Sequence, residues 1–516
     1  MGTSNNGFGS IRNLTETELI RMELQCEIDS RKSLADRRQL GQFSTPNDLA
    51  REITSFGLRL FDSKEIRFLE PAIGTGSFYS ALLSEVSDGT AISAIGYEID
   101  KLFFDAATKL WSKENIMLYN EDFTRSYPRE KVNLLICNPP YVRHHLLSSG
   151  EKKRLAQAVK EEVDANISML AGLYCHFILL AHKWLEPGAV CGWLIPSEFM
   201  DVNYGNAIKK YLLEKVHLLR IHRYDPMDCQ FEDALVSSAV VWFKNELVED
   251  DYEVEFSFGQ THFLPSSIKN VKKSELLTEH KWTRFPQYDV RQTEKNPSLH
   301  LGDYFDVKRG LATGDNDFFI LSRDQIDKLD IDMSFLTPIL PSPRKLRCDE
   351  VDSDNNGYPC IDPQLFLLNC ALSEGDIREQ HPNLWNYLQQ GVFTTATKYL
   401  CKNRKTWYFQ EQREVTPFLC SYMGRNNDDS SPPFRFILNH SNAVATNSYL
   451  MLYPKDWLAE MISNEPALKR QIWHALKSIT SLDLIQEGRV YGGGLKKIEP
   501  KELRQVKCTE LYSLLN

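Results

Sequence analysis

The sequence is informative first through what it lacks. Its 516 residues include 11 cysteines, from Cys26 to Cys508, but none falls in a C-x-x-C pair, the spacing typical of zinc and dithiol sites. No apolar run approaches the ~20 residues that a membrane-spanning helix needs, and Met1–Ser10 does not resemble a signal peptide. We therefore expect a reduced, cytoplasmic protein with neither a metal ion nor a membrane partner.

The overall charge gives no strong indication of a partner. Charged residues make up 25% of the chain and hydrophobic residues 42%, which are ordinary proportions for a globular protein. A formal net charge of -10 argues mildly against a polyanionic partner, although a basic face can lie on an acidic protein. The length is too great for one ordinary core and favours two domains.

The order of apolar segments predicts an α/β fold in the first half. From Gln39 to Phe243, short apolar runs alternate with helical stretches such as Phe78–Glu85, Lys101–Trp111 and Ser168–Trp184. This alternation implies right-handed crossovers and a largely parallel, doubly wound sheet. The expected strands are Ile66–Leu69, Ala91–Tyr97, Val132–Cys137, Val190–Ile195 and Ser237–Trp242.

The pattern changes near residue 245, where an acidic, loop-like segment begins. We therefore predict three parts. Residues 1–38 form an N-terminal extension whose charged segment Glu16–Arg38 is a surface helix. Residues 39–245 form the α/β domain, and residues 246–516 form a second domain of mixed α+β structure.

A glycine-containing turn follows the first expected strand, in the segment Phe68–Phe78. Gly74 and Gly76 permit a tight turn and a close approach to a ligand. The turn lacks the third glycine of the dinucleotide fingerprint and the lysine of a P-loop. Glu70 instead suits a ligand with a cationic ammonium group. Taken alone, the segment fits a plain tight turn about as well.

Two further acidic segments follow the next strands. Glu98 ends the second strand, where a carboxylate typically accepts hydrogen bonds from ribose hydroxyls, while Asp100 fits a helix N-cap better. Asp122 could accept a hydrogen bond from an adenine amino group, with Phe123 packing on the ring. Each acid alone is also compatible with a helix cap or a solvated turn.

The most specific motif is Asn138-Pro139-Pro140-Tyr141, directly after an apolar strand. The prolines fix an extended loop and remove two N–H donors, which leaves carbonyl groups free. Together with the Asn138 amide oxygen, such a carbonyl can accept both N–H groups of an exocyclic amine and localise its lone pair. Tyr141 offers a flat face to a planar base. The alternative is a turn that merely terminates the strand.

These motifs, in this order, resemble the gamma-type DNA adenine-N6 methyltransferases of restriction–modification systems, the group that includes the Taq modification methylase. The segment Gly41–Pro46 precedes them, as in that family. The resemblance implies a Rossmann-like domain that uses S-adenosyl-L-methionine, followed by a DNA target-recognition domain. It also implies that the target adenine is flipped out of the duplex.

The resemblance also implies roles for individual residues. Thr45, Glu70, Ala72 and Gly74 would hold the methionine end of the cofactor, Glu98 its ribose, and Asp122 and Phe123 its adenine. Asn138, which would also border the cofactor, would bind the target amine with the Pro139 carbonyl. Tyr141 and Phe231 would stack on the flipped base, although Phe231 fits a loop aromatic equally well.

The motifs in the second half of the chain are less specific than those in the first half. Three segments, Val307–Ile320, Tyr399–Tyr408 and Gly492–Lys497, combine basic residues with aromatics or glycines, which suits contact with DNA phosphates. A single lysine or arginine is more often a solvated surface charge, and only the clustering of these cations argues otherwise. The candidates for DNA contact are Lys308, Arg309, Lys402, Arg404, Lys405 and Lys496.

Other substrates stay open on the same motifs. Asn-Pro-Pro-Tyr also occurs in enzymes that methylate a protein glutamine amide or RNA, but Gly41–Pro46 and the large second domain favour double-stranded DNA. Cytosine amine methylases more often carry Ser at the position of Asn138. A DNA-binding protein without catalysis is a further alternative. Because we recognise no nuclease constellation, we expect a separate restriction endonuclease.

Overall fold

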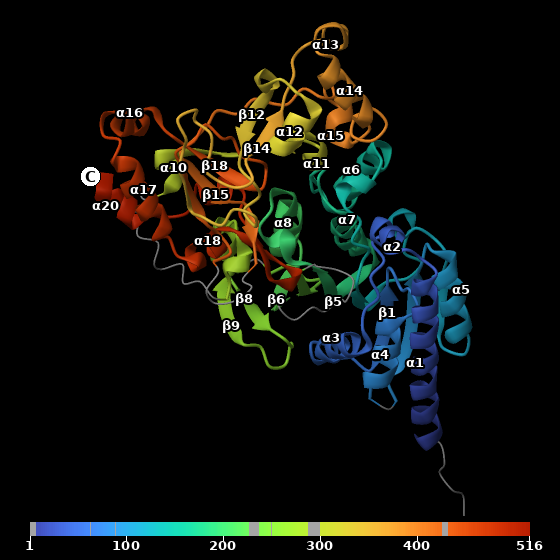
Figure 1. Cartoon of the computed structure of the whole chain (residues 1–516). Helices are drawn as coiled ribbons and strands as arrows, with labels where there is room; N and C mark the ends of the chain where they lie inside the picture. Colours follow the sequence, from blue (N-terminus) through green and yellow to red (C-terminus); the bar gives the residue numbers. More distant parts are fainter. Residues whose placement is uncertain are drawn as a thin grey trace, which may run out of the picture. The chain divides into compact units, whose positions relative to one another are not determined.

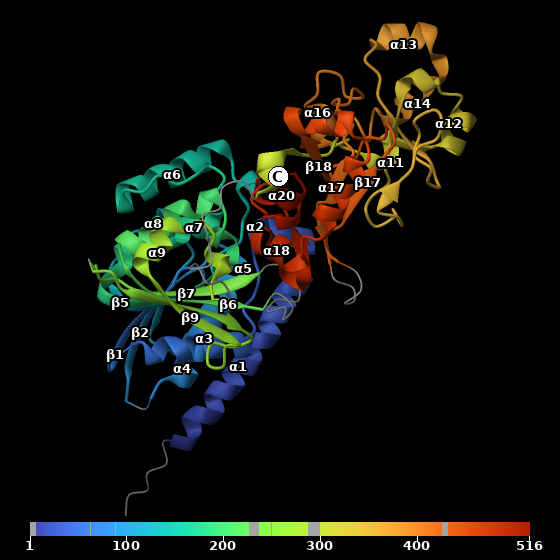
Figure 2. The same ribbon diagram turned by 90° about the vertical axis from the view of Figure 1, so that its left-hand side faces the viewer.

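The structure is a computed structural model that describes residues 7–61, 63–87, 89–225, 237–248, 250–286, 300–425 and 432–515. The chain divides into two compact units, Met1–Gln292 and Thr293–Asn516. Figures 1 and 2 show the two units from perpendicular directions. Each unit has its own hydrophobic core, so each is described by itself.

The first unit is built on one sheet, which has nine strands among the described residues, in the order β3-β2-β1-β4-β5-β7-β6-β8-β9. The first five strands in that order are parallel, and β7 runs antiparallel to both of its neighbours. The strands are β1 (Glu65–Glu70), β2 (Ala91–Tyr97), β3 (Ile116–Tyr119), β4 (Val132–Cys137), β5 (Leu185–Pro196), β6 (His217–Tyr224), β7 (Ser238–Lys244), β8 (Glu253–Gly259) and β9 (Ser267–Lys272).

Helices cover both faces of this sheet, which is the expected doubly wound arrangement. Figure 2 shows α3 and α4 below the sheet and α7 and α8 above it. The helices of the unit are α1 (Gly7–Ser30), α2 (Leu34–Leu40), α3 (Asn47–Arg59), α4 (Ser77–Glu85), α5 (Lys101–Leu110), α6 (Ser149–Val163), α7 (Leu173–Leu180), α8 (Asn206–Glu214) and α9 (Lys273–Thr278).

Burial explains why β1, β4 and β5 were recognisable from sequence. Every residue of β4 is buried, as expected of a central parallel strand with both faces covered. Trp193 of β5 and Trp242 of β7 are among the largest fully buried side chains. The short edge strand β3 and the charged strand β6 lack such a run, and both were missed.

The boundary expected near residue 245 is wrong, because the sheet continues beyond it. β8 pairs parallel with β6, and β9 pairs antiparallel with β8, so both strands extend the first unit. Phe256, Trp282 and Phe285 belong to the core of that unit. The acidic segment after β7 is therefore a connection within one sheet, and the unit ends at Gln292.

The second unit combines small sheets with short helices, as the mixed α+β expectation requires. Its sheets, within the described residues, have the orders β10-β18-β15-β17-β13, β11-β14-β12 and β16-β20-β19. The strands are β10 (Phe305–Arg309), β11 (Ile320–Ser322), β12 (Leu336–Ile339), β13 (Glu350–Val351), β14 (Leu365–Leu368), β15 (Phe418–Ser421), β16 (Met423–Gly424), β17 (Phe436–Asn439), β18 (Tyr449–Pro454), β19 (Arg489–Tyr491) and β20 (Leu495–Lys497).

The helices of the second unit are short and lie between or after these strands. They are α10 (Leu301–Tyr304), α11 (Asn316–Phe319), α12 (Arg323–Leu329), α13 (Glu374–Gln380), α14 (Pro382–Gly391), α15 (Tyr399–Lys402), α16 (Asp456–Asn464), α17 (Leu468–Lys477), α18 (Ser481–Glu487), α19 (Pro500–Leu503) and α20 (Thr509–Leu515). In the part of the chain that the structure describes, no helix is both long enough and apolar enough to cross a membrane.

Candidate active site

A cavity of about 620 Å³ lies in the first unit, at the carboxyl ends of the parallel strands. Glu70 ends β1, Glu98 follows β2 and Asn138 follows β4, and all three line the cavity. β1 lies between β2 and β4, at the point where the strand order reverses. Open parallel sheets bind their ligands at this position. The size is that of a pocket for a small molecule.

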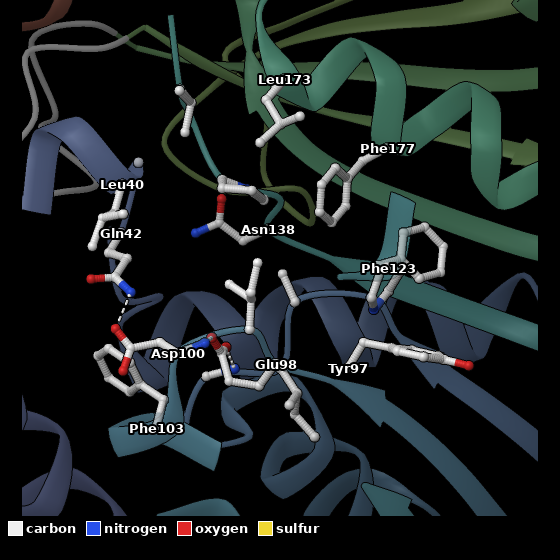
Figure 3. Close-up of a pocket in the computed structure, with 18 of the residues that line it drawn as sticks. Leu40, Gln42, Tyr97, Glu98, Asp100, Phe103, Phe123, Asn138, Leu173 and Phe177 are labelled. Atoms are coloured by element: carbon white, nitrogen blue, oxygen red, sulfur yellow. Dashed lines mark hydrogen bonds between the residues drawn. The ribbon is translucent and has the colours of Figure 1, made fainter. Parts of the chain in front are cut away.

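The charged side chains that line the cavity, among the described residues, are all acidic. Six carboxyl groups line it, and no Lys, Arg or His does so among the described residues; the six are Glu70, Glu98, Asp100, Glu121, Asp122 and Glu151. Such a lining disfavours phosphates and favours a cationic ligand. Figure 3 shows Tyr97, Phe123 and Phe177 at one end of the cavity and Gln42 with Asp100 at the other. The cavity therefore suits a cationic ligand that also carries a flat ring.

The glycine turn after β1 is shaped by two close approaches. Gly74 has a φ of +57° and donates its N–H to Glu98 Oε2 at 2.9 Å. Gly76 has a φ of +91°, and a Cβ there would lie 2.5 Å from Trp111 Nε1, which donates to the Thr75 carbonyl. A side chain is excluded at Gly76 by both conformation and space. The turn is thus held against β2 and α5.

Burial shifts the titration of two of the acids. Glu70 is 2% exposed and accepts from the Tyr79 N–H at 3.2 Å, and its burial raises the pKa well above the usual value. Burial also raises the pKa of Glu98 to about 7, against the opposing hydrogen bonds from the N–H groups of Asp100 and Gly74. A cationic or hydrogen-bonding ligand would stabilise the charged form of each group.

Asp122 and Phe123 occupy the aromatic end of the cavity. Asp122 caps a short helix, and its Oδ1 accepts from the Thr124 N–H at 2.9 Å and from the Thr124 hydroxyl at 2.7 Å. Its Oδ2 pairs with Arg125 at 3.1 Å. The Phe123 ring packs on Trp184, with centroids 4.4 Å apart. Both residues line the cavity, and Asp122 is already engaged by its own cap.

The Asn138 side chain is held in one orientation. Its Nδ2 donates to the Phe43 carbonyl at 3.0 Å and to Thr45 Oγ1 at 3.1 Å. Because a carbonyl can only accept, the amide nitrogen must face Phe43. The other end, Oδ1, is buried and has no hydrogen-bond partner among the described atoms. An unsatisfied buried acceptor is costly, so this oxygen is suited to receive a donor from a ligand.

The rest of the Asn-Pro-Pro-Tyr motif is packed into the fold. Pro140 lines the cavity, whereas Pro139 and Tyr141 are absent from the described lining. Tyr141 is 9% exposed, and its hydroxyl donates to the Leu194 carbonyl of β5 at 3.0 Å. Its backbone N–H donates to the Gly41 carbonyl at 3.2 Å, which holds the motif against the Gly41–Pro46 segment. Phe231, the other expected stacking residue, lies outside the described residues.

The residues predicted to bind the cofactor thus line one cavity. The side chains that hold this lining in place were not predicted from the sequence. Thr45, Ala72 and Gly74 line it beside the acids described above. Asp100 caps α5 as expected, but its Oδ2 also accepts from Gln42 Nε2 at 2.9 Å. Gln25 of α1 lines the cavity as well. A lone glutamine in a charged helix gives no sequence signal for such a role.

In the second unit, two of the three basic segments come together. Arg404 Nη2 donates to the Ala312 carbonyl at 2.7 Å, so the segment around Tyr399–Tyr408 contacts the one around Val307–Ile320. Lys402 and Lys405 are exposed there. The segment Val307–Ile320 contains the end of β10, then a turn, and then α11, for which Asp315 is the N-cap.

The remaining candidates lie on two other strands of the second unit, β10 and β20. Lys308 and Arg309 are exposed on β10, and the Arg309 guanidinium lies 4.0 Å from the ring centroid of Tyr422. Lys496 lies on β20, and burial lowers its pKa. Lys308, Lys402 and Lys405 are exposed, and Arg309 is exposed but also donates to the Asn447 carbonyl at 3.0 Å. Arg404 and Lys496 are partly engaged in packing.

One group of possible metal ligands occurs among the described residues, on the second unit. Ligand atoms of Glu350, Asp352 and His440 lie within 4.8 Å of one another. Glu350 Oε1, however, accepts from Arg470 Nε and from His440 Nε2, each at 3.0 Å. The negative charge of Glu350 is thus balanced by side chains of the protein, and we assign no ion to the group.

Two family models match this chain. The model described as Eco57I restriction-modification methylase matches residues 45–229, and the C-terminal domain of Type II methyltransferase M.Eco57I matches residues 285–515. The two matched segments correspond to the two units, with the second starting close to Thr293.

Similar proteins of known name extend over most of the chain. Type II methyltransferase M.AccI of Acinetobacter calcoaceticus is 25% identical and covers 96% of this chain and 90% of its own length. M.XamI of Xanthomonas campestris pv. amaranthicola is 24% identical and covers 87% and 81%. In fold, the chain is similar to the Type IIL restriction-modification enzyme MmeI, with a TM-score of 0.54 at 12% identity. That match covers 89% of this chain and 64% of MmeI.

The cavity can be tested against the cofactor that such enzymes use. S-adenosyl-L-methionine carries a sulfonium, an ammonium, a ribose and an adenine ring. An all-acidic lining with an aromatic end fits these groups, and Glu98 stands where a ribose hydroxyl acceptor is expected. The residues present, the two family models and the full-length relatives agree. The chain belongs to the S-adenosyl-L-methionine-dependent methyltransferases of restriction–modification systems.

Proposed function

We propose that this enzyme methylates the exocyclic N6 amine of adenine in double-stranded DNA, as the modification component of its system. The observation that carries the proposal is the buried, unpartnered Oδ1 of Asn138, in an amide whose orientation the Phe43 carbonyl fixes. An acceptor in this position matches an N–H donor of a primary amine. The amine of adenine is the donor that the order of the motifs and their resemblance to the gamma-type methyltransferases favour.

The proposed reaction depends mainly on position and polarisation. The bound cofactor supplies a methyl group that is already activated by its sulfonium. Asn138 Oδ1 would accept one N–H of the target amine and the Pro139 carbonyl the other, which localises the nitrogen lone pair for attack in line. A nitrogen–carbon bond forms as the carbon–sulfur bond breaks, and the surplus proton of the amine leaves to solvent. No other covalent step is required of the protein.

The target nitrogen of a paired adenine is buried in the base stack, so the base would be flipped out of the duplex toward Asn138. Tyr141 is the proposed stacking partner. The hydrogen bond from its hydroxyl to the Leu194 carbonyl fixes the ring at its far end, which limits the entropy lost on binding a base. Phe231 remains a predicted second stacking residue.

We propose that the second unit holds the DNA. Lys308, Arg309, Lys402 and Lys405 are its exposed candidates for phosphate contact. We further propose that the companion endonuclease is a separate protein, since both matched family models describe methyltransferase segments. Incubation of unmethylated plasmid with the enzyme, cofactor and Mg²⁺ should give methylated but uncut DNA. Cleavage by the purified chain would refute the separate-endonuclease proposal.

The reaction itself is tested by incubating the enzyme with labelled cofactor and unmodified genomic DNA. The product nucleosides are separated by mass spectrometry, and the modified positions are mapped by sequencing. We expect N6-methyladenine confined to one short motif. Label in N4-methylcytosine would reject adenine as the target, and label scattered without a motif would reject the modification role.

A further inference from the structure

Helix α1 lies against the glycine turn that binds the cofactor. Its Arg21 side chain is 2% exposed, and Nη1 donates to Thr75 Oγ1 and to Ser77 Oγ, each at 2.9 Å. These two acceptors stand on either side of Gly76, at the tightest point of the turn. One guanidinium nitrogen therefore joins both sides of the turn to a helix more than fifty residues earlier in the chain.

The buried charge of Arg21 is fully paired. Its Nε and Nη2 donate to the two carboxylate oxygens of Glu18 at 2.8 and 2.7 Å, a bidentate geometry. Glu18 also accepts from the Ser80 hydroxyl of α4. A buried, directional ion pair of this kind sets geometry more than it adds stability. A helix needed only to cover the core would present apolar side chains at this point.

Gln25, one turn further along α1, connects two walls of the cavity. Its Oε1 accepts from Thr75 Oγ1 at 2.8 Å, and its Nε2 donates to Ser44 Oγ at 2.6 Å. Thr75 belongs to the turn after β1, and Ser44 belongs to the Gly41–Pro46 segment. All three residues line the cavity. A single side chain thus fixes the spacing between two cofactor-binding segments.

A third segment that lines the cavity, the turn between β2 and α5, is held by a residue just beyond the end of α1. Lys32 forms an ion pair with Asp100, at the turn between β2 and α5, and its Nζ donates to Gln42 Oε1 at 2.8 Å. Gln42 in turn donates to Asp100. The glycine turn, the Gly41–Pro46 segment and the β2–α5 turn are therefore tied to one N-terminal element.

We propose that α1 is a clamp on the cofactor site, in which Arg21 and Gln25 are positioning residues that hold the glycine turn and the Gly41–Pro46 segment together and slow cofactor release. The expected N-terminal extension is then part of the binding machinery. Holding loops in their bound geometry raises affinity because less order is lost on binding. The proposal concerns the cofactor and does not depend on which amine is methylated.

The first test measures cofactor binding to the full-length enzyme by calorimetry and its release by stopped-flow fluorescence. Gln25→Ala should raise the cofactor Kd about three- to tenfold, mostly through faster dissociation. Activity at low cofactor concentration should fall and should recover when more cofactor is added. Glu23→Ala, at an exposed position of the same helix, is the matched control and should change neither value. An unchanged Kd in Gln25→Ala would overturn the clamp.

A double-mutant cycle separates positioning from direct contact with the cofactor. If Gln25 acts through Ser44, Ser44→Ala should add little to the loss in Gln25→Ala, and the double variant should resemble Gln25→Ala. Fully additive losses would mean that Gln25 and Ser44 act independently on the cofactor, which would overturn the positioning role. Arg21→Lys keeps the charge but cannot span Thr75, Ser77 and Glu18, so it should fold and still release cofactor faster. Release at the wild-type rate from folded Arg21→Lys would count against Arg21.

Discussion

The two units present charge in opposite ways. The first gathers acids around a cavity at the ends of adjacent strands, with no basic residue among the described lining. The second displays exposed cations, such as Lys308, Arg309, Lys402 and Lys405, of which Lys308 and Arg309 lie over aromatic rings. One lining suits a small cationic cofactor and the other suits a polyanion. From this difference we expect chemistry and target binding to depend on separate groups, which can be disrupted separately.

The largest expected effect falls on the chemistry of the first unit. Asn138→Ala removes the unpartnered acceptor, so the rate of methyl transfer in a single turnover should fall by about 10²- to 10³-fold. Because Asn138 holds neither the methionine end nor the ribose, the cofactor Kd should change by less than about threefold. DNA affinity, measured by fluorescence anisotropy, should be retained. A normal transfer rate would remove Asn138 from the mechanism.

The corresponding experiment on the second unit removes two of its exposed cations. Replacing Lys308 and Arg309 by Ala should raise the DNA Kd about tenfold and reduce the slope of log K against log salt by about 2. Cofactor affinity should not change. Lys328→Ala, at an exposed position of α12, is the matched control. If the double variant and the control behave alike, these cations are solvated surface charges.

A pH profile sharpens the account of the acidic cavity. Burial raises the pKa of Glu98 to about 7, so the group is neutral below that pH and charged above it. The charged form accepts hydroxyl hydrogen bonds better, so cofactor affinity should weaken as pH falls, by about tenfold between pH 8 and pH 6. Glu98→Gln should bind more weakly at pH 8 and lose this difference. Parallel profiles would show that another group titrates.

The smallest effect concerns the hydroxyl of Tyr141. Tyr141→Phe removes its hydrogen bond to the Leu194 carbonyl and should lower the free energy of unfolding by about 1 kcal/mol, measured in urea. The ring remains, so methyl transfer should change little. Tyr141→Ala should lose less activity on a mismatched target, where flipping is easier, than on a paired one. Equal losses on both substrates would argue against stacking.

The cavity was largely predictable because its residues follow apolar strands. Glu70, Glu98 and Asn138 each stand directly after a run that burial requires, and parallel strands bring their carboxyl ends to one edge. The contacts of α1 were not predictable, because Arg21 and Gln25 find Thr75 and Ser44 through packing alone. The domain boundary predicted near residue 245 was wrong because a polar loop that connects two strands of one sheet resembles a linker between domains in its composition. The cations of the second unit carry no periodic signal at all.

The central claim is tested most directly by letting acceptors compete for the methyl group. Labelled cofactor and enzyme are added to equal amounts of unmodified duplex DNA, RNA and protein from one host, and the label in each fraction is measured. The account predicts label in DNA, on the N6 of adenine, and its loss with Asn138→Ala. Label in RNA or on protein glutamine would contradict the account, and the second unit would then need a different role.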